Sequence, residues 1–149
     1  MYLDTAIIIK LLVREADSGR FNRELAGQGF ETSELAITEV HSALLAKERA
    51  GHISTRERES AGEKFSAMVE DELIKIFPLN RTVLERANAI LRACHPKIPL
   101  RTLDALHVAT CDLHRSGTLA TTDGRMRAAC EQFAIPRLPA KPEDVTATK

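Results

Sequence analysis

Four acidic residues stand in apolar surroundings, where a globular chain has little reason to place a charge. Asp4 separates a short apolar start from an Ile-rich run, and Glu39 follows the stretch Leu-Ala-Ile-Thr. Asp104 is the only acid in the first nine residues of a nearly all-apolar segment, and Asp123 comes directly after Leu-Ala-Thr-Thr. An ionised carboxylate among apolar side chains is costly unless it is paired or bound to a metal. These four acids are therefore the candidates for a functional site.

Each acid also has an ordinary structural explanation. Asp4 and Asp123 are favoured residues for the N-cap of a helix, and Glu39 suits the first turn of one. Asp104 could form a salt bridge with Arg101, which lies three residues earlier. An accidental convergence of all four is much less probable than an incidental role for any one. We therefore expect a shared site.

Converging carboxylates require a cation. Two carboxylates about 4 Å apart repel each other by roughly 4 kcal/mol at an effective dielectric of 20. Oxygen-only ligands suit Mg²⁺ or Mn²⁺, and Mg²⁺ commonly takes one or two carboxylates together with waters and substrate phosphates. Such a site activates a water molecule and stabilises the leaving oxygen of a phosphodiester. The expected chemistry is in-line hydrolysis.

The elements that would bring these acids together alternate along the chain. Alternating strands and helices predict an α/β fold with a parallel sheet, whose carboxyl strand ends share one ligand-binding edge. Asp4, Glu39 and Asp123 fall where a strand or loop gives way to a helix. The expected strands are 1–3, 30–33, 73–77, 118–121 and an edge strand at 135–138, and the expected helices are 5–13, 18–26, 38–51, 55–69, 83–94, 102–114 and 123–133.

Length and composition fit one globular domain. The chain has 149 residues, of which 44% are hydrophobic and 28% charged, so we expect a single domain at 1–140 with a frayed polar tail at 141–149. The 21 Lys and Arg balance the 21 Asp and Glu, which argues against indiscriminate nucleic-acid binding. Aromatic residues make up 4% and Trp is absent, so a base-stacking platform is not expected.

Cysteine usage and hydropathy indicate a cytoplasmic protein. Cys94, Cys111 and Cys130 are an odd set without a short paired spacing, which predicts buried free thiols in a reducing compartment. No apolar run reaches the length of a membrane span, and the first residues lack a basic leader. We expect no membrane partner.

Other catalytic motifs are weak. Asp104 and His107 lie three residues apart and could form half of a zinc site, but no second His or Cys has a matching spacing. His107 is therefore expected to be packed, with one ring nitrogen bonded. The chain has no G-x-S-x-G motif and no phosphate-binding loop.

Four short segments together resemble one known family. The segments 2–5 (Tyr-Leu-Asp-Thr), 38–40 (Thr-Glu-Val), 103–109 (Leu-Asp-Ala-Leu-His-Val-Ala) and 121–123 (Thr-Thr-Asp) resemble the PIN-domain ribonucleases, in particular the VapC-type toxins of bacterial toxin–antitoxin modules. The resemblance covers nearly the whole chain, and the third segment is the most distinctive. It implies a three-layer sandwich with a central parallel sheet of four to five strands flanked by helices.

The resemblance also implies an activity and its residues. The implied protein is a Mg²⁺-dependent endoribonuclease, usually a homodimer, which a small antitoxin protein holds silent. Thr121 matches the active-site hydroxyl of the family and would bond to a metal ligand or a coordinated water. Arg101 would contact a substrate phosphate, if it does not pair with Asp104. The matching acids are Asp4, Asp104 and Asp123, which would hold the first metal, and Glu39, which would orient the attacking water or hold a second metal.

Two alternative functions stay open at this point. A catalytically silent PIN-like module would use the acids for a structural cation or a protein partner, and a DNA-directed nuclease would use the same metals on the other polymer. The first two helices carry an apolar set that would supply part of an antitoxin groove or a dimer surface, namely Ile7, Ile8, Leu11, Leu12, Phe21 and Leu25.

Overall fold

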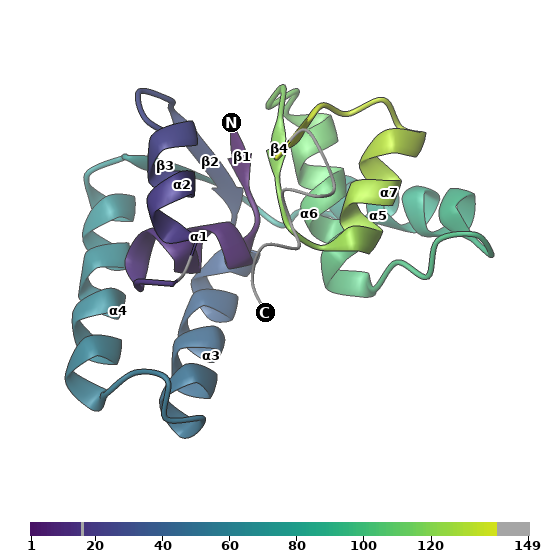
Figure 1. The fold of residues 1–149 in the computed structure, drawn as a ribbon. Helices are drawn as coiled ribbons and strands as arrows, with labels where there is room; N and C mark the ends of the chain where they lie inside the picture. Colours follow the sequence, from purple (N-terminus) through teal and green to yellow (C-terminus); the bar gives the residue numbers. More distant parts are fainter. Residues whose placement is uncertain (16, 140–149) are drawn as a thin grey trace.

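The computed structural model describes residues 1–15 and 17–139 and confirms the predicted α/β fold. The predicted tail at 141–149 lies outside the described residues. Strands and helices alternate in chain order (Figure 1). The strands are β1 (Tyr2–Leu3), β2 (Phe30–Ser33), β3 (Ile74–Phe77), β4 (Leu119–Ala120) and β5 (Arg137–Leu138), and the helices are α1 (Thr5–Leu12), α2 (Ser18–Glu24), α3 (Leu35–Arg49), α4 (Thr55–Glu70), α5 (Arg81–Cys94), α6 (Thr102–Leu113) and α7 (Gly124–Gln132).

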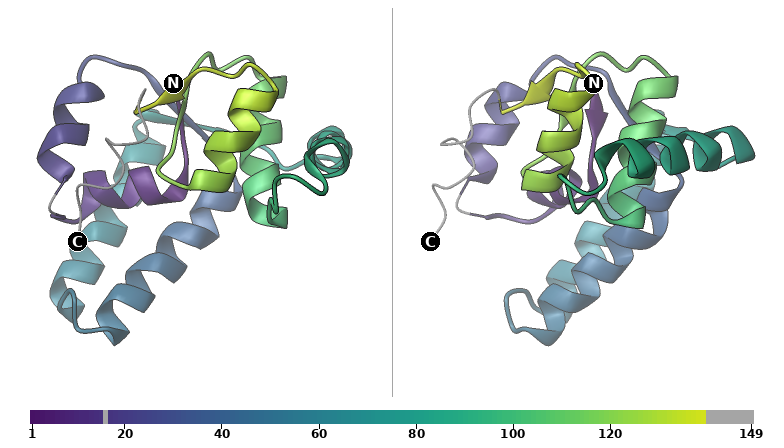
Figure 2. Two further views of the ribbon diagram at one scale, coloured as in Figure 1. Left: turned by 45° about the vertical axis from the view of Figure 1, so that its right-hand side comes forward. Right: turned by 90° about the vertical axis from the view of Figure 1, so that its right-hand side faces the viewer.

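The sheet is parallel throughout and separates two helical layers. Its strand order is β3-β2-β1-β4-β5. Successive strand residues point to opposite faces, so Tyr2 packs among α5, α6 and α7 while Leu3 packs among α1 to α4. Figures 1 and 2 show these two groups of helices on either side of the sheet, with α5 lying across α6. The result is the three-layer sandwich that the sequence predicted.

The register of the two central strands places the candidate acids. β1 and β4 are neighbours, with Tyr2 opposite Leu119 and Leu3 opposite Ala120. The amide of Asp4 donates to the carbonyl of Ala120 at 3.1 Å, so the two strands end side by side. Asp4 therefore starts α1 directly beside the segment that leads to α7.

Helix α3 begins earlier than the sequence predicted. The sequence predicts a helix over 38–51, but the helix begins at Leu35. The Glu34 amide donates to the carbonyl of Phe77 at 2.9 Å, and the Glu34 carboxylate accepts from the Leu79 amide at 3.0 Å. The chain is thus tied to the end of β3 and turns at once into the helix. Glu39 consequently lies in the second turn of α3, and not at a strand-to-helix junction.

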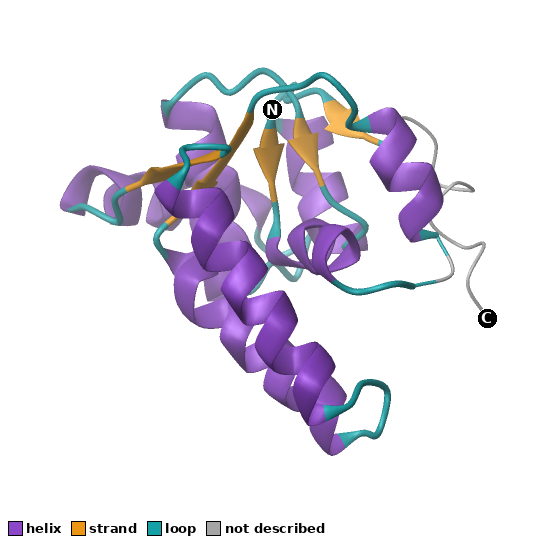
Figure 3. Cartoon of the chain, turned by 90° about the vertical axis from the view of Figure 1, so that its left-hand side faces the viewer, coloured by secondary structure: helices purple, strands orange, loops and turns teal. Residues whose placement is uncertain are grey.

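Helices α3 and α4 form an antiparallel pair that projects beyond the sheet (Figure 3). Helix α4 starts with a capping box. The Ser54 hydroxyl accepts from the Glu57 amide at 3.3 Å, and the Glu57 carboxylate accepts from the Ser54 amide at 2.8 Å. These reciprocal bonds satisfy helix-end donors and fix where the second helix of the pair begins.

The apolar set of the first two helices is mostly unavailable to partners. Ile7, Ile8 and Phe21 are fully buried, and Leu25 is 1% exposed, in the core between the sheet and α3 and α4. The expectation that this set forms a partner surface is therefore wrong for these four residues, because the sheet and the helix pair already cover them.

The predicted burial of the three cysteines is confirmed. Cys94, Cys111 and Cys130 are buried free thiols, as predicted, and burial raises the pKa of the Cys111 thiol to about 12. Among the helices of the described ranges, none combines the length and apolar character that a membrane span needs.

Candidate active site

Asp4 is the most buried of the four acids. It follows β1 as the N-cap of α1, where its Oδ1 accepts from the Ile7 amide at 2.8 Å. Its Oδ2 accepts a short hydrogen bond from the Thr121 hydroxyl. Burial raises the pKa of the Asp4 carboxyl, and the charge of Asp123 raises it further, against these two hydrogen bonds. Asp4 is therefore a carboxylate that a nearby cation would stabilise.

Thr121 connects Asp4 to Asp123. While it donates to Asp4, its oxygen accepts from the Asp123 amide at 3.1 Å. Asp123 is the N-cap of α7, and its Oδ1 accepts from the amides of Arg125 and Met126 at 2.8 and 3.0 Å. Burial opposes ionisation of Asp123, but these bonds and the Arg125 guanidinium hold its pKa below the usual value. Asp123 is thus ionised next to a buried acid.

Asp104, on α6, is repelled by the negative charge of Asp123. It lies in the first turn of that helix, where its Oδ2 accepts from the Arg101 amide at 3.3 Å. Burial, followed by repulsion from Asp123, raises the pKa of the Asp104 carboxyl. The charge of Asp123 therefore raises the pKa of both Asp4 and Asp104. Three acids that are distant in the sequence thus belong to one site.

Glu39 is held by side chains from two other helices, one of which, Thr5, directly follows Asp4 in the chain. Its Oε2 accepts from the Thr5 hydroxyl at 2.5 Å and contacts His107 Nε2 at 2.7 Å. The other ring nitrogen of His107, Nδ1, contacts the Tyr2 hydroxyl at 2.9 Å. Burial opposes ionisation, but the bonds from His107 and Thr5 keep the pKa of Glu39 low. Glu39 is an ionised carboxylate with a fixed orientation.

The structure corrects the reading of His107. The expectation that His107 is packed is confirmed, because its side chain is only 4% exposed. The expectation of one bonded ring nitrogen is wrong, because both nitrogens have partners. An ionised carboxylate only accepts hydrogen bonds, so Nε2 carries a hydrogen toward Glu39. His107 lies three residues after Asp104, so the two side chains lie on the same face of one helix. This spacing is the sequence signal that places His107 near the acids.

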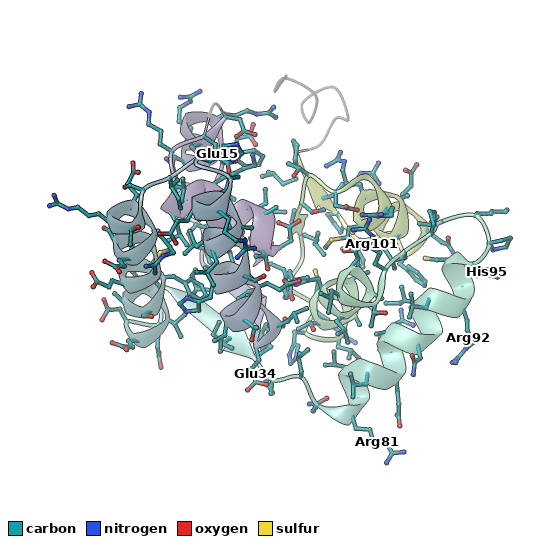
Figure 4. The ribbon with its side chains drawn as sticks, turned by 90° about the horizontal axis from the view of Figure 1, so that it is seen from below. Glu15, Glu34, Arg81, Arg92, His95 and Arg101 are labelled. Atoms are coloured by element: carbon teal, nitrogen blue, oxygen red, sulfur yellow. The ribbon has the colours of Figure 1, made fainter. Side chains whose placement is uncertain are left out.

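Arg125 contacts two of the four acids. Its guanidinium Nη2 lies 3.0 Å from Asp123 Oδ2, and its Nε lies 3.6 Å from Asp104 Oδ2. The Nε atom is buried without a hydrogen-bond partner, since 3.6 Å is too long for one. The expected ion pair between Arg101 and Asp104 is absent from the described part of the chain; Arg101 is exposed, on the face shown in Figure 4.

The donor set fits a hard divalent cation. All four acids offer oxygen ligands, and burial and mutual repulsion already raise the pKa of two of them. No group of three or more His, Cys, Asp or Glu side chains within residues 1–15 and 17–139 has a ready metal-binding arrangement. Arg125 supplies the positive charge between Asp104 and Asp123. A cation that binds these acids would therefore compete with the guanidinium.

Replacing Arg125 with glutamine is expected to tighten metal binding and to destabilise the metal-free protein. Without the guanidinium, Asp104 and Asp123 repel each other with no internal compensation. We expect the Mn²⁺ affinity, measured by isothermal titration calorimetry, to rise roughly three- to tenfold, and the Tm in EDTA to fall. Arg92→Gln, at an exposed position on α5, is the control. Weaker Mn²⁺ binding by the Arg125 variant would contradict the competition.

Comparison with known proteins identifies a family and several similar chains. The family model described as "PIN domain" matches residues 1–132. Ribonuclease VapC46 of Mycobacterium tuberculosis is 35% identical over 141 residues, which cover 91% of this chain and 93% of that protein. The crystal structure of Mycobacterium tuberculosis VapC20, a toxin that cleaves the sarcin–ricin loop, aligns with a TM-score of 0.66 at 21% identity, over 86% of this chain and 93% of VapC20. A toxin–antitoxin complex from Klebsiella pneumoniae aligns with a TM-score of 0.58 at 20% identity, over 95% of this chain and 96% of the aligned chain.

Proposed function

Because this chain belongs to the PIN-domain family, we propose that it is a metal-dependent endoribonuclease and the toxin of a toxin–antitoxin pair. The observation that carries the proposal is the set of contacts among three acids from separate elements: Thr121 joins Asp4 to Asp123, and Arg125 contacts both Asp123 and Asp104. The similarity to a protein named as a ribonuclease of the VapC type supports the reaction class. Residues 1–140 would act as one nuclease domain.

The acids would hold Mg²⁺, or Mn²⁺ in its place. Asp4, Asp104 and Asp123 are the proposed ligands of the first metal, and Glu39 would orient the attacking water or contribute to a second metal site. A bound ion of this kind lowers the pKa of a coordinated water and stabilises the leaving oxygen of a phosphodiester. The oxygen-only donor set supports this assignment.

The other side chains of the site would orient the acids and the substrate. Thr121 fixes the direction of the Asp4 carboxylate through its hydroxyl. Thr5 and His107 hold Glu39 so that its remaining lone pairs can accept a proton from the attacking water. Arg101 is exposed at the N-terminus of α6, where its guanidinium is free to contact a substrate phosphate.

The proposed partners follow from the reaction class. RNA would be the substrate and a small antitoxin protein the inhibitor, as the similarity of fold to a chain of a toxin–antitoxin complex suggests. We also propose a homodimer that works in the cytoplasm. Three buried free thiols fit a reducing compartment of that kind.

The chemical ends of the products test the proposal. With metal-activated water as the nucleophile, cleavage of a single-stranded RNA in Mg²⁺ or Mn²⁺ should leave 5′-phosphate and 3′-hydroxyl ends, and EDTA should abolish it. Ends of the 2′,3′-cyclic phosphate type would contradict the mechanism. Equal cleavage of a DNA of the same sequence would assign the site to a nuclease without RNA preference, and a lack of any cleavage would leave a silent binding module.

A further inference from the structure

A cleft of about 550 Å³ leads away from the acidic site between α1 and α3. At one end it is lined by Thr5, Glu39 and Thr122, which belong to or adjoin the site. At the other end it is lined by Lys10 of α1 and Lys47 of α3. The cleft therefore connects the acids to a pair of basic side chains on the same face of the molecule.

A single carboxylate bridges the two lysines. Glu15 Oε2 lies 2.9 Å from Lys10 Nζ, and Glu15 Oε1 lies 2.5 Å from Lys47 Nζ. Lys10 also contacts Asp17 at 2.8 Å. Burial opposes ionisation, but the bonds from the two lysines hold the pKa of Glu15 below its usual value. Glu15, which is labelled in Figure 4, is thus an anion held by two cations, and all three side chains line the cleft.

The position of this anion is suited to a neighbouring phosphate. Lys47 lies eight residues after Glu39 on α3, which is about 12 Å along the helix axis, and Lys10 lies five residues after Thr5 on α1, which is about 7.5 Å. A polynucleotide whose reacting phosphate lies at the acids and whose chain follows the cleft would bring another phosphate to the lysines. Two ammonium groups that hold the two oxygens of a carboxylate can equally hold two oxygens of a phosphate.

We propose that Lys10 and Lys47 bind a backbone phosphate of the RNA strand in this cleft, and that Glu15 occupies the place of that phosphate in the free protein. The inference rests on the proposed function, because it needs RNA as the substrate. Binding of RNA would exchange the Glu15 carboxylate for a phosphate without moving either lysine. Partly exposed ion pairs add little net stability, so the exchange is not strongly opposed.

Two single substitutions should change RNA affinity in opposite directions. Glu15→Gln removes the competing anion, and we expect it to strengthen binding roughly three- to tenfold. Lys47→Gln removes a phosphate ligand, and we expect it to weaken binding by a similar factor and to lower the slope of log K against log salt by about 0.7. Lys47→Arg keeps the charge and should retain most of the affinity.

Fluorescence anisotropy with a short labelled single-stranded RNA of mixed sequence measures these effects. The titrations are run in EDTA, and a gel confirms that the RNA stays intact. Glu48→Gln is the matched control for Glu15, because it removes the same charge from the residue next to Lys47 while its partner Arg58 lies on α4. Lys75→Gln, at an exposed position on β3, is the control for Lys47.

The outcomes separate this inference from the proposed function. The exchange is supported if Glu15→Gln, but not Glu48→Gln, binds RNA more strongly than the wild type, and if Lys47→Gln, but not Lys75→Gln, binds it more weakly. If the two glutamate variants behave alike, or if Lys47→Gln behaves like Lys75→Gln, the inference is overturned while RNA cleavage by the wild type still supports the function. A wild-type protein that neither binds nor cleaves RNA overturns both.

Discussion

Replacing Asp4 with asparagine is expected to reduce RNA cleavage by orders of magnitude and, at the same time, to make the metal-free protein more stable. Asp4 is 4% exposed, and burial followed by the charge of Asp123 raises its pKa. Asparagine keeps the size of the side chain and an oxygen that can accept from the Ile7 amide. The variant therefore loses a buried negative charge without losing the helix cap. Loss of one metal ligand should reduce cleavage by roughly 10²–10³-fold.

The stability difference should depend on pH in a defined direction. A raised pKa in the folded state means that this state binds the proton more tightly than the unfolded chain does. In the wild type, stability is therefore lost as the pH rises from the unfolded pKa of Asp, near 4, through the raised folded pKa. The asparagine variant lacks this loss. In EDTA, the variant should be no more stable than the wild type in acid, and the difference in stability should reach its full size at neutral pH.

Thermal unfolding with and without metal measures both effects. In EDTA at neutral pH the Asp4→Asn variant should have a higher Tm than the wild type. In a domain of this size, each 1 kcal/mol of unfolding free energy shifts the Tm by about 2–4 °C. Added Mn²⁺ should raise the Tm of the wild type, because the ion binds only the folded site, and should leave that of the variant nearly unchanged. Asp112→Asn, whose carboxylate pairs with Arg86 outside the site, should respond to Mn²⁺ as the wild type does. A variant that cleaves RNA at a rate close to that of the wild type, or that melts below the wild type in EDTA, would contradict the assignment of Asp4.

The fold and the position of two acids were predictable because local rules determine both. A parallel sheet aligns the carboxyl ends of its strands, and Asp at the start of a helix is a favoured cap. Asp4 and Asp123 satisfy both rules, and the structure places them as the N-caps of α1 and α7 after neighbouring strands. Their proximity therefore follows from strand order and from helix capping together.

The features that sequence patterns missed depend on tertiary contacts. Helix α3 starts before Thr38 because Glu34 is bonded to residues at the end of β3, far along the chain. The choice of Arg125 over Arg101 as the partner of Asp104 depends on where α7 packs against α6. Arg101 and Arg125 each lie within a few residues of an acid in the sequence, so spacing alone does not show which of them pairs with Asp104. The bridge from Glu15 to Lys47 likewise joins segments that no local pattern relates.

Replacing His107 with alanine is expected to lower both stability and cleavage, while glutamine should restore much of each. The imidazole is buried and joins the Tyr2 hydroxyl to the Glu39 carboxylate. Alanine leaves a cavity and two polar groups short of a partner, which should cost about 2–4 kcal/mol. Glu39 would keep only its bond from Thr5. A less firmly held carboxylate should reduce cleavage by roughly 10–10²-fold.

The glutamine variant tests whether His107 acts through Glu39 or only fills space. Its amide nitrogen can donate to Glu39 and its amide oxygen can accept from Tyr2, so that both contacts of the imidazole are reproduced by a neutral group. His107→Leu fills the same volume with no polar atom and serves as the packing control. If His107 positions Glu39, kcat should be lower in the leucine variant than in the glutamine variant. This difference in kcat should exceed what the difference in Tm between the two variants explains.

The Tyr2→Phe variant extends the same argument by one step. Removing the hydroxyl leaves the ring in place among α5, α6 and α7 and takes away the partner of His107 Nδ1. The imidazole then keeps its bond to Glu39 but loses the contact that fixes its own orientation. We expect a smaller loss of kcat than with His107→Leu, and no change in KM, because neither side chain touches the Lys10 and Lys47 end of the cleft. If kcat in all these variants simply follows Tm, His107 is part of the core and Glu39 is held well enough by Thr5.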